Sequence, residues 1–307
     1  MKAAYVFPGQ GSQSVGMGRD LYDTFGVARA VFEQADKVLG FPLSRLCFEG
    51  PEEELRQTIN AQPAIVTVSL ACLKAIQGID HVLPPASFVA GHSLGEYTAL
   101  AAADVLDLPT TVYLARERGR LMHEAGLKQP GGMVAIIGLD EAILAEVCRE
   151  TGTWIANVNS PGQLVISGAR DNLPRAADLA KARGAARAIP LAVSGAFHTP
   201  LMQPAVEGMS QAIANLTFRN PAITVIANTT AQPLTTAGVI KTELLNQLCH
   251  GIQWQRSVEY MVGQGVTDFI EIGPGKVLAG LIKRIDKSVT IRNISDAAAI
   301  RNLSNLS

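Results

Sequence analysis

The sequence lacks an excess of charge of either sign, and it lacks a long apolar run. Its 307 residues include 26 basic and 27 acidic side chains, and a net charge of −1 favours neither nucleic acid nor a charged membrane surface as a partner. No uninterrupted apolar stretch approaches the roughly 20 residues of a membrane span. The apolar run 3–7 is too short for a signal peptide, and no cleavage pattern follows it. We therefore expect a soluble, cytoplasmic protein that binds neither nucleic acid nor membrane.

Cysteines and aromatic residues are also sparse. Cys47, Cys72, Cys148 and Cys249 form no Cys-x-x-Cys pair and no Cys/His pair with metal-ligand spacing. We expect buried free thiols in a reducing compartment, and no metal site. Aromatic residues make up 5% of the chain and charged residues 17%, against 48% apolar residues. The core should therefore consist mainly of Ala, Val, Leu and Ile, which suits helices packed closely on a parallel sheet.

Short apolar strands alternate with helical stretches over much of the chain. Strands are expected at 3–7, 87–90, 223–227 and 268–272. Helices are expected at 17–39, 52–59, 62–76, 96–103, 109–125, 202–216, 242–249, 254–263 and 277–285. This alternation is typical of a parallel sheet that helices cover on both faces.

The pattern changes in the middle of the chain. Strands at 133–137, 154–158, 163–167 and 186–193, with helices at 140–151 and 172–183, give the order β-α-β-β-α-β of a ferredoxin-like unit. The expected fold is therefore α/β. A hydrolase-like main domain on a parallel sheet would comprise residues 1–128 and 196–307, and a ferredoxin-like subdomain, residues 129–195, would be inserted into it.

The pentapeptide Gly91-His92-Ser93-Leu94-Gly95 lies between an expected strand and an expected helix. That context is what a nucleophile elbow requires, because the serine must project from a sharp strand-to-helix turn. The N–H of Leu94 would lie at a helix N-terminus, unpaired and free to donate to an oxyanion. Such an elbow indicates acyl transfer through a serine ester, whereas the alternative is a turn without a catalytic role.

A serine nucleophile needs a base, and His198 is the best candidate among the five histidines. It follows a predicted strand where the chain re-enters the main sheet, and it comes after the serine in chain order. His92 should point away from the elbow and pack. His81 and His123 lie in polar contexts, and His250 lies at an ambiguous helix end. No carboxylate is evident as a third member of a triad.

Two further segments invite a functional interpretation. Residues 9–13 have the sequence Gly-Gln-Gly-Ser-Gln, but Ser14 replaces the third glycine of a dinucleotide fingerprint and Met17 replaces the lysine of a Walker loop. Two interpretations of residues 9–13 remain: a turn without a functional role, or a turn whose backbone supplies a second oxyanion donor beside the elbow. Arg116, Arg118 and Arg120 form either a solvated basic helix face or a site where one arginine points inward and binds a substrate carboxylate.

Together these segments resemble the malonyl-CoA:acyl carrier protein transacylase family, the acyltransferases of fatty acid and polyketide synthesis. The resemblance spans nearly the whole chain, and the standalone length is similar to that of the discrete bacterial enzyme. The segments that carry it are Phe7-Pro8-Gly9-Gln10-Gly11-Ser12-Gln13, Gln62-Pro63-Ala64, Gly91-His92-Ser93-Leu94-Gly95-Glu96-Tyr97, Arg118-Gly119, Asn157-Val158-Asn159-Ser160-Pro161-Gly162-Gln163, Gly195-Ala196-Phe197-His198, Gln253-Trp254 and Glu271-Ile272-Gly273-Pro274-Gly275-Lys276.

The resemblance implies catalytic roles by position. Ser93 would be the acylated nucleophile and His198 its base. The backbone N–H groups of Gln10 and Leu94 would form the oxyanion hole. The backbone carbonyl of Gln247 would orient His198, which accounts for the missing acid.

The resemblance also implies a substrate site. Arg118 would bind the free malonyl carboxylate, with Met122 and Phe197 as further substrate contacts. The ring of Phe197 would leave little room for an α-methyl branch. Two positions depart from the family pattern: Thr199 replaces the usual serine, and His250 stands where many members carry asparagine, with no role assigned to it.

The implied reaction is ping-pong transfer from malonyl-CoA to the phosphopantetheine thiol of acyl carrier protein, without a cofactor, by a monomer. Candidates for a basic surface facing the acidic carrier are Lys181, Arg183, Arg187, Lys276, Lys283 and Arg284. The alternatives are a trans-acting polyketide synthase acyltransferase, a malonate decarboxylase subunit that moves malonyl groups, a serine thioesterase or other hydrolase, and a non-catalytic carrier-binding module. The sequence does not distinguish a fatty acid from a polyketide pathway.

Overall fold

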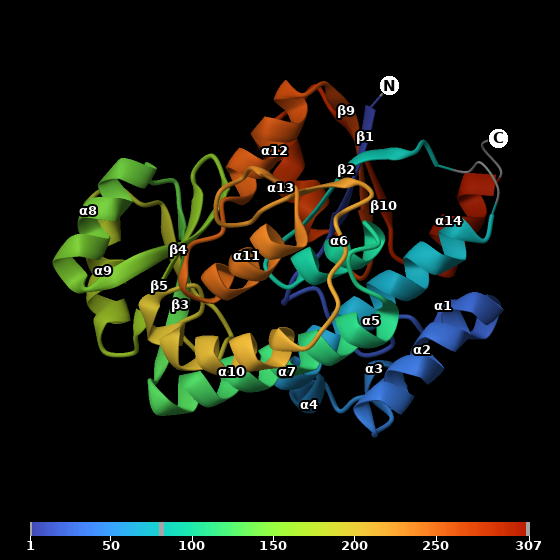
Figure 1. Ribbon diagram of the computed structural model, residues 1–307. Coiled ribbons are helices and arrows are strands. Elements are labelled where there is room, and N and C mark those ends of the chain that lie inside the picture. The colour runs from blue at the N-terminus through green and yellow to red at the C-terminus, as the bar shows by residue number, and fades with distance from the viewer. Residues whose placement is uncertain (1, 80–82, 305–307) are drawn as a thin grey trace.

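The computed structural model describes residues 2–79 and 83–304, which form two lobes, each built around its own sheet (Figure 1). The larger sheet has the strand order β10-β9-β1-β2-β7-β8. Neighbouring strands are parallel except β8, which pairs antiparallel with β7. The strands are β1 (Lys2–Phe7), β2 (Ala86–Gly91), β7 (Thr224–Ile226), β8 (Pro233–Leu234), β9 (Val266–Ile272) and β10 (Thr290–Ile294). The expected α/β class with a parallel-sheet core is confirmed.

Helices cover both faces of this sheet. They are α1 (Arg19–Thr24), α2 (Gly26–Leu39), α3 (Leu43–Glu49), α4 (Glu52–Arg56), α5 (Thr58–Gln77), α6 (Gly95–Ala102), α7 (Leu108–Lys128), α10 (Gln203–Ala214), α11 (Ala237–Cys249), α12 (Trp254–Gly263), α13 (Val277–Ile285) and α14 (Ala297–Ser304), with the 3₁₀ turn η1 (Pro200–Met202). Successive side chains of a strand point to opposite faces of the sheet. Ala4 and Val6 of β1 therefore pack in a hydrophobic cluster with α12 and α13, whereas Phe7 packs in a larger hydrophobic cluster on the other face.

The smaller sheet belongs to the predicted insertion. Its strands β3 (Gly131–Ile137), β4 (Thr153–Ser160), β5 (Gln163–Ala169) and β6 (Arg187–Pro190) lie in the order β4-β5-β3-β6, and all their pairings are antiparallel. Helices α8 (Glu141–Thr151) and α9 (Asn172–Ala182) contribute to its separate core. The predicted order β-α-β-β-α-β is the observed one. The boundaries 129 and 195 themselves stay a prediction.

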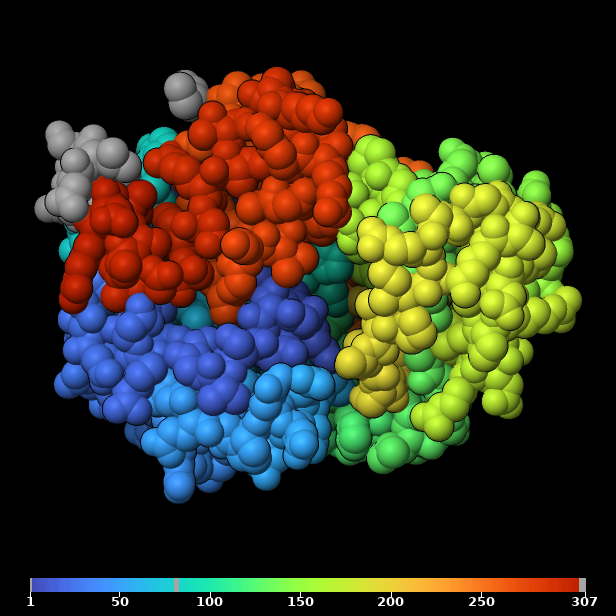
Figure 2. Space-filling view, turned by 180° about the vertical axis from the view of Figure 1, so that it is seen from behind, coloured from blue at the N-terminus to red at the C-terminus, as the bar shows by residue number. Residues whose placement is uncertain are grey.

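A furrow separates the two lobes. Figure 2 shows it between the yellow-green small lobe and the blue and orange large lobe. Backbone hydrogen bonds nevertheless join the lobes at one place, where Val158 of β4 donates to Ile252 (2.9 Å) and Ile252 donates to Ala156 (2.9 Å). Gly251 permits this approach, since a Cβ there would lie 2.7 Å from the carbonyl oxygen of Ile155.

Several expected elements differ from the observed ones. The stretch 17–39 forms two helices, because Phe25 is extended and its N–H caps the end of α1. The helix expected at 62–76 begins four residues earlier, so that Pro63 lies inside α5. Proline has no N–H to offer the carbonyl four residues earlier, and the carbonyl of Ile59 accepts a hydrogen bond from Arg116 instead (2.9 Å).

Other differences concern element ends. β6 ends at Pro190, three residues before the expected end, although the N–H of the next residue, Leu191, still donates to the carbonyl of Met133 (2.9 Å). α11 begins at Ala237, five residues before the expected 242. Strands β8 and β10 and helices α3 and α14 were not expected.

Helix α5 is long and apolar enough to cross a membrane by length and composition. Of its most apolar 18-residue window, 83% is buried inside the structure. The apolar side chains of α5 are therefore buried in the core of the large lobe.

Candidate active site

The elbow forms between β2 and α6 as predicted, and its glycines are needed for close packing. A Cβ on Gly91 would lie 1.9 Å from the backbone carbon of Gly95, and one on Gly95 would lie 2.1 Å from the carbonyl oxygen of Phe7. Ser93 has φ 51°, the left-handed region that side chains other than glycine seldom adopt. The tight turn thus projects the Ser93 hydroxyl towards the furrow.

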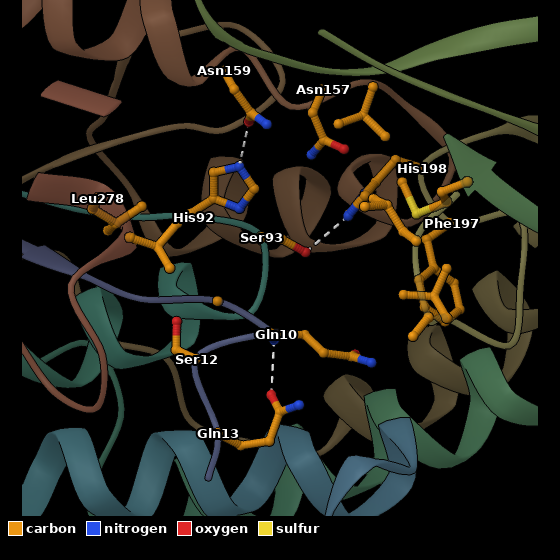
Figure 3. Close-up of a pocket in the computed structure, with 18 of the residues that line it drawn as sticks. Gln10, Ser12, Gln13, His92, Ser93, Asn157, Asn159, Phe197, His198 and Leu278 are labelled. Atoms are coloured by element: carbon orange, nitrogen blue, oxygen red, sulfur yellow. Dashed lines mark hydrogen bonds between the residues drawn. The ribbon is translucent and has the colours of Figure 1, made fainter. Parts of the chain in front are cut away.

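Ser93 and His198 lie within hydrogen-bond distance of each other. Their Oγ and Nε2 atoms are 2.8 Å apart, and Figure 3 shows the two side chains facing one another across the cavity. The other ring nitrogen, Nδ1, lies 2.7 Å from the backbone carbonyl of Gln247. A carbonyl oxygen only accepts, so Nδ1 carries the proton and Nε2 is left free to accept one from serine. The arrangement is a dyad with a backbone carbonyl in the place of a carboxylate.

The environment keeps the His198 imidazole neutral. Burial and the nearby positive charge of Arg118 lower the pKa of His198 to about 3. Its backbone is also in the left-handed region, with φ 61°. The next residue, Thr199, stabilises this turn, because its hydroxyl donates to the carbonyl of Ala196 (2.7 Å) and accepts from the N–H of Leu201 (3.3 Å). Threonine therefore keeps the hydroxyl that the family's usual serine would supply.

Two backbone N–H groups near Ser93 are available to an oxyanion. In the part of the chain that the structure describes, no acceptor bonds to the N–H of Gln10 or of Leu94. Gly9 brings the first of these groups to the elbow, since a Cβ on Gly9 would lie 2.4 Å from the carbonyl oxygen of His92. Leu94 precedes α6, so its N–H belongs to a helix N-terminus. Both positions fit the donor roles that the resemblance implies.

Of the three alternating arginines, Arg118 is the one that points inward. It is 1% exposed, and it donates to Gln62 Oε1 (2.7 Å), to Gln247 Oε1 (2.7 Å) and to Ser93 Oγ (3.1 Å). Its Nε atom has no partner among the described residues. A buried guanidinium whose Nη2 lies 3.1 Å from the nucleophile is suited to a substrate anion. Arg116 and Arg120 instead bond to Asn60 and to Glu117 and Glu124 near the surface.

A cavity of about 340 Å³ surrounds these groups and receives side chains from both lobes. Met122 and Phe197, the other expected substrate contacts, line it and are 1% and 5% exposed. Met133 and Val165 of the small lobe complete its apolar wall. The site thus places a charged end at Arg118 next to a mainly apolar chamber.

The remaining histidines have other partners. His92 packs edge-on against Trp254, at 5.7 Å between ring centroids, which agrees with the expected packing role. It also lines the cavity and bonds through Nε2 to Asn159 of β4 (2.8 Å), a contact that the sequence did not predict. His250 lies on the surface, His123 is half-buried, and His81 lies outside the described residues.

Sequence reasoning missed three polar residues that hold the site together. Gln62 connects Arg118 to Thr58, whose hydroxyl donates to the Gln10 side chain (2.8 Å). Asn228 accepts from the N–H of Ser93 (2.7 Å), and Glu96 accepts from the N–H of Asn228 (2.9 Å). The available signal was weak: a lone glutamine in the apolar run 62–76, and a glutamate directly after the elbow.

No group of three or more His, Cys, Asp or Glu side chains suited to a metal ion occurs among residues 2–79 and 83–304.

The fold and the site define an α/β protein with a serine–histidine dyad at a nucleophile elbow. The chain belongs to the family described as acyl transferase domain, which matches residues 4–304. It is 43% identical over 304 residues to the malonyl CoA-acyl carrier protein transacylase of Bacillus subtilis, covering 97% of this chain and 95% of that protein.

Solved structures agree with this assignment. The acyl-carrier-protein-S-malonyltransferase of Bartonella henselae superposes with a TM-score of 0.95 at 40% identity, covering 100% of this chain and 99% of that one. A malonyl-transacylase in complex with its type II PKS acyl-carrier protein gives the same TM-score and identity, with full coverage of both chains.

Proposed function

We propose that this enzyme transfers the malonyl group from malonyl-CoA to the phosphopantetheine thiol of acyl carrier protein, with Ser93 carrying it in between. The full-length similarity to malonyl CoA-acyl carrier protein transacylases supports the reaction. The observation that carries the site assignment is the placement of Ser93 Oγ between His198 Nε2 (2.8 Å) and Arg118 Nη2 (3.1 Å).

In the first half-reaction, His198 accepts the Ser93 proton as Oγ attacks the thioester carbonyl. The N–H groups of Gln10 and Leu94 stabilise the oxyanion, and Arg118 holds the distal carboxylate. The tetrahedral intermediate then collapses, and coenzyme A leaves as a thiol with the proton from His198. In the second half-reaction the carrier thiol repeats these steps on the malonyl ester. Coenzyme A enters as part of the substrate, and no cofactor or metal is required.

The carrier is expected to dock on basic residues around the furrow. Lys276 precedes the cavity-lining start of α13, and Arg284 reaches across to Gln163 of the small lobe. Arg183 is less available, because it pairs with Glu146 and Glu150. Complex formation by a similar malonyl-transacylase with a type II PKS carrier supports a protein partner of this kind. A soluble monomer of the cytoplasm stays the expectation from the sequence, and the fatty acid and polyketide pathways both stay open.

Mass spectrometry of the protein after incubation with malonyl-CoA tests this proposal. A malonyl ester is expected on the peptide that contains Ser93, and none in Ser93→Ala. Addition of carrier protein bearing phosphopantetheine should move the ester to the carrier. Rapid loss of the ester to water without transfer would favour the thioesterase alternative, and absence of any ester would contradict the serine intermediate.

A further inference from the structure

Glu96 is a buried carboxylate to which the steps above give no role. It lies in the first turn of α6, three residues after Ser93, and it is 0% exposed. Oε1 accepts from the N–H of Asn228 (2.9 Å), and Oε2 accepts from Nε2 of Gln247 (2.5 Å). Burial, and after it the nearby carboxylate of Glu243, raise the pKa of Glu96 well above its usual range, but both oxygens face N–H donors, which is the bonding pattern of an ionised carboxylate.

Gln247 connects this carboxylate to the arginine of the site. Its Nε2 donates both to Glu96 and to the carbonyl of Ser93 (2.9 Å), while its Oε1 accepts from Arg118 Nη2 (2.7 Å). A primary amide has a donor end and an acceptor end, and an ionised carboxylate only accepts. Glu96 therefore requires the NH₂ end of Gln247, which turns the oxygen of that amide towards Arg118.

Asn228 connects the same carboxylate to the elbow. Its side chain accepts from the N–H of Ser93 (2.7 Å) and donates to the carbonyl of Gly91 (2.7 Å), on either side of the left-handed turn. Glu96 is thus one residue removed from the nucleophile on one side and from Arg118 on the other. It touches neither the cavity nor Ser93 Oγ in the recorded contacts.

We propose that Glu96 is a positioning residue for substrate choice: it fixes the orientation of the Gln247 amide, and through it the Arg118 guanidinium, so that an acyl group with a free carboxylate is preferred. The inference rests on the proposed role of Arg118. A glutamine at position 96 removes the charged acceptor of the Gln247 NH₂ group, so that only the carbonyl of Ser93 still holds that end of the amide firmly. The acceptor that Gln247 offers to Arg118 is then less firmly placed, while the dyad keeps its serine, its histidine and the Gln247 carbonyl.

The test compares malonyl-CoA and acetyl-CoA as donors to carrier protein, for the wild-type enzyme and Glu96→Gln. We expect KM for malonyl-CoA to rise, and the ratio of kcat/KM for malonyl-CoA over acetyl-CoA to fall about tenfold, as for loss of one hydrogen bond to a charged group. The acetyl-CoA value should change less than about twofold. A purely structural role would lower both values equally and leave the ratio unchanged, and that result would overturn the proposal.

Asp268→Asn is the matched control. Asp268 is also a buried carboxylate, but it pairs with Arg292 of β10, and it neither bonds to Gln247 or Asn228 nor affects the pKa of Glu96. Its replacement should leave the substrate ratio unchanged. If Glu96→Gln does not fold, Glu96→Asp serves, because its shorter side chain cannot reach both partners. A lower ratio is again expected, and an unchanged one overturns the proposal.

A double variant separates this inference from the proposed function. If Glu96 acts through Arg118, Glu96→Gln should not lower the ratio further in an Arg118→Ala background. A further fall there would contradict the pathway through Gln247. If Arg118→Ala alone leaves the ratio unchanged, the carboxylate-binding role of Arg118 fails. If Arg118→Ala lowers the ratio and Glu96→Gln does not, only the role of Glu96 fails.

Discussion

At the scale of single residues, Arg118 is where substrate choice is most directly tested. Arg118→Ala removes the buried cation beside Ser93 and leaves Gln62 and Gln247 without their shared donor. Malonyl transfer should fall by roughly 100-fold, as for loss of a charge-assisted pair, whereas acetyl transfer should rise. Steady-state kinetics with the two coenzyme A esters provides the measurement.

Arg116→Ala is the control for that change. Arg116 lies two residues earlier on α7, but it bonds to Ile59 and Asn60 away from the cavity. Its loss should lower stability without altering the ratio of malonyl to acetyl transfer. Equal loss of preference in both variants would show that the effect is not specific to a carboxylate site.

The pH dependence follows from the environment of His198. A general base works in its neutral form, and a pKa lowered to about 3 keeps this imidazole neutral through mild acid. We expect kcat/KM for malonyl-CoA to stay level from about pH 8 to about pH 5, where an ordinary histidine of pKa about 6.5 would lose about 30-fold.

Arg118→Ala provides a second check on this pKa. Because the Arg118 charge helps to lower the pKa of His198, its removal should shift the acid limb of acetyl transfer to higher pH. An acid limb near pH 6.5 in the wild-type enzyme would contradict the assignment of a neutral, buried base.

The residues identified from sequence are those with local signals. Ser93 lies in a pentapeptide, His198 in a segment after a strand, and Arg118 in a run of charge on a helix. Asn228 carries no such signal, and Glu96 has only its place directly after the elbow, because their importance depends on a contact between positions 132 residues apart. Gln247 was placed only by family resemblance, since nothing in its own helix marks a backbone carbonyl as special.

At the scale of elements, the elbow depends on the contact between α6 and the end of β1. Gly95→Ala would place a Cβ 2.1 Å from the carbonyl oxygen of Phe7, where neither backbone can move freely. We expect a loss of at least about 2 kcal/mol in the free energy of unfolding, typical of overpacked backbone sites, and loss of activity. Denaturant unfolding measures the first.

Gly280→Ala is the matched change in another helix. Outside the backbone of α13 itself, no atom of residues 2–79 and 83–304 lies within 4 Å of a Cβ built at Gly280, so alanine should stabilise the protein by about 0.5–1 kcal/mol through helix propensity. A similar loss of stability in both variants would argue against the steric explanation for Gly95.

Elements were predictable where the apolar period was long, and less so at their ends. The spacing of apolar residues could not place the break between α1 and α2, because Phe25 continues the helical apolar pattern although its backbone is extended. Likewise the helix was expected to start at 62, beside Pro63, but α5 begins at Thr58, and Arg116 from α7 satisfies the carbonyl that proline leaves free. A hydrogen bond of this kind comes from an element that is distant in sequence, so the sequence around Pro63 cannot predict it.

At the scale of the whole molecule, the four cysteines report on folding. Cys47 and Cys72 are fully buried, Cys148 and Cys249 nearly so, and burial raises the pKa of each thiol, to about 11 for Cys249. Since the thiolate is the reactive form, native protein should react slowly with Ellman's reagent, and Cys249 should react first.

Protein unfolded in concentrated guanidinium chloride is the reference for that experiment. All four thiols should then titrate at once, because none is engaged in a disulfide. A thiol that reacts rapidly in the native protein would contradict the burial described here.

The bond between Ile252 and β4 has a consequence for protein engineering. The segment that pairs with the small lobe begins only a few residues after Gln247, whose carbonyl orients His198. A chimaera that replaced the small lobe alone would leave one half of this pairing behind. A chimaera should therefore exchange the 250–253 loop together with the small lobe, although this loop lies more than 50 residues beyond the insertion in sequence. Boundaries drawn from sequence alone would separate the small lobe from the segment next to Gln247, whose carbonyl orients His198.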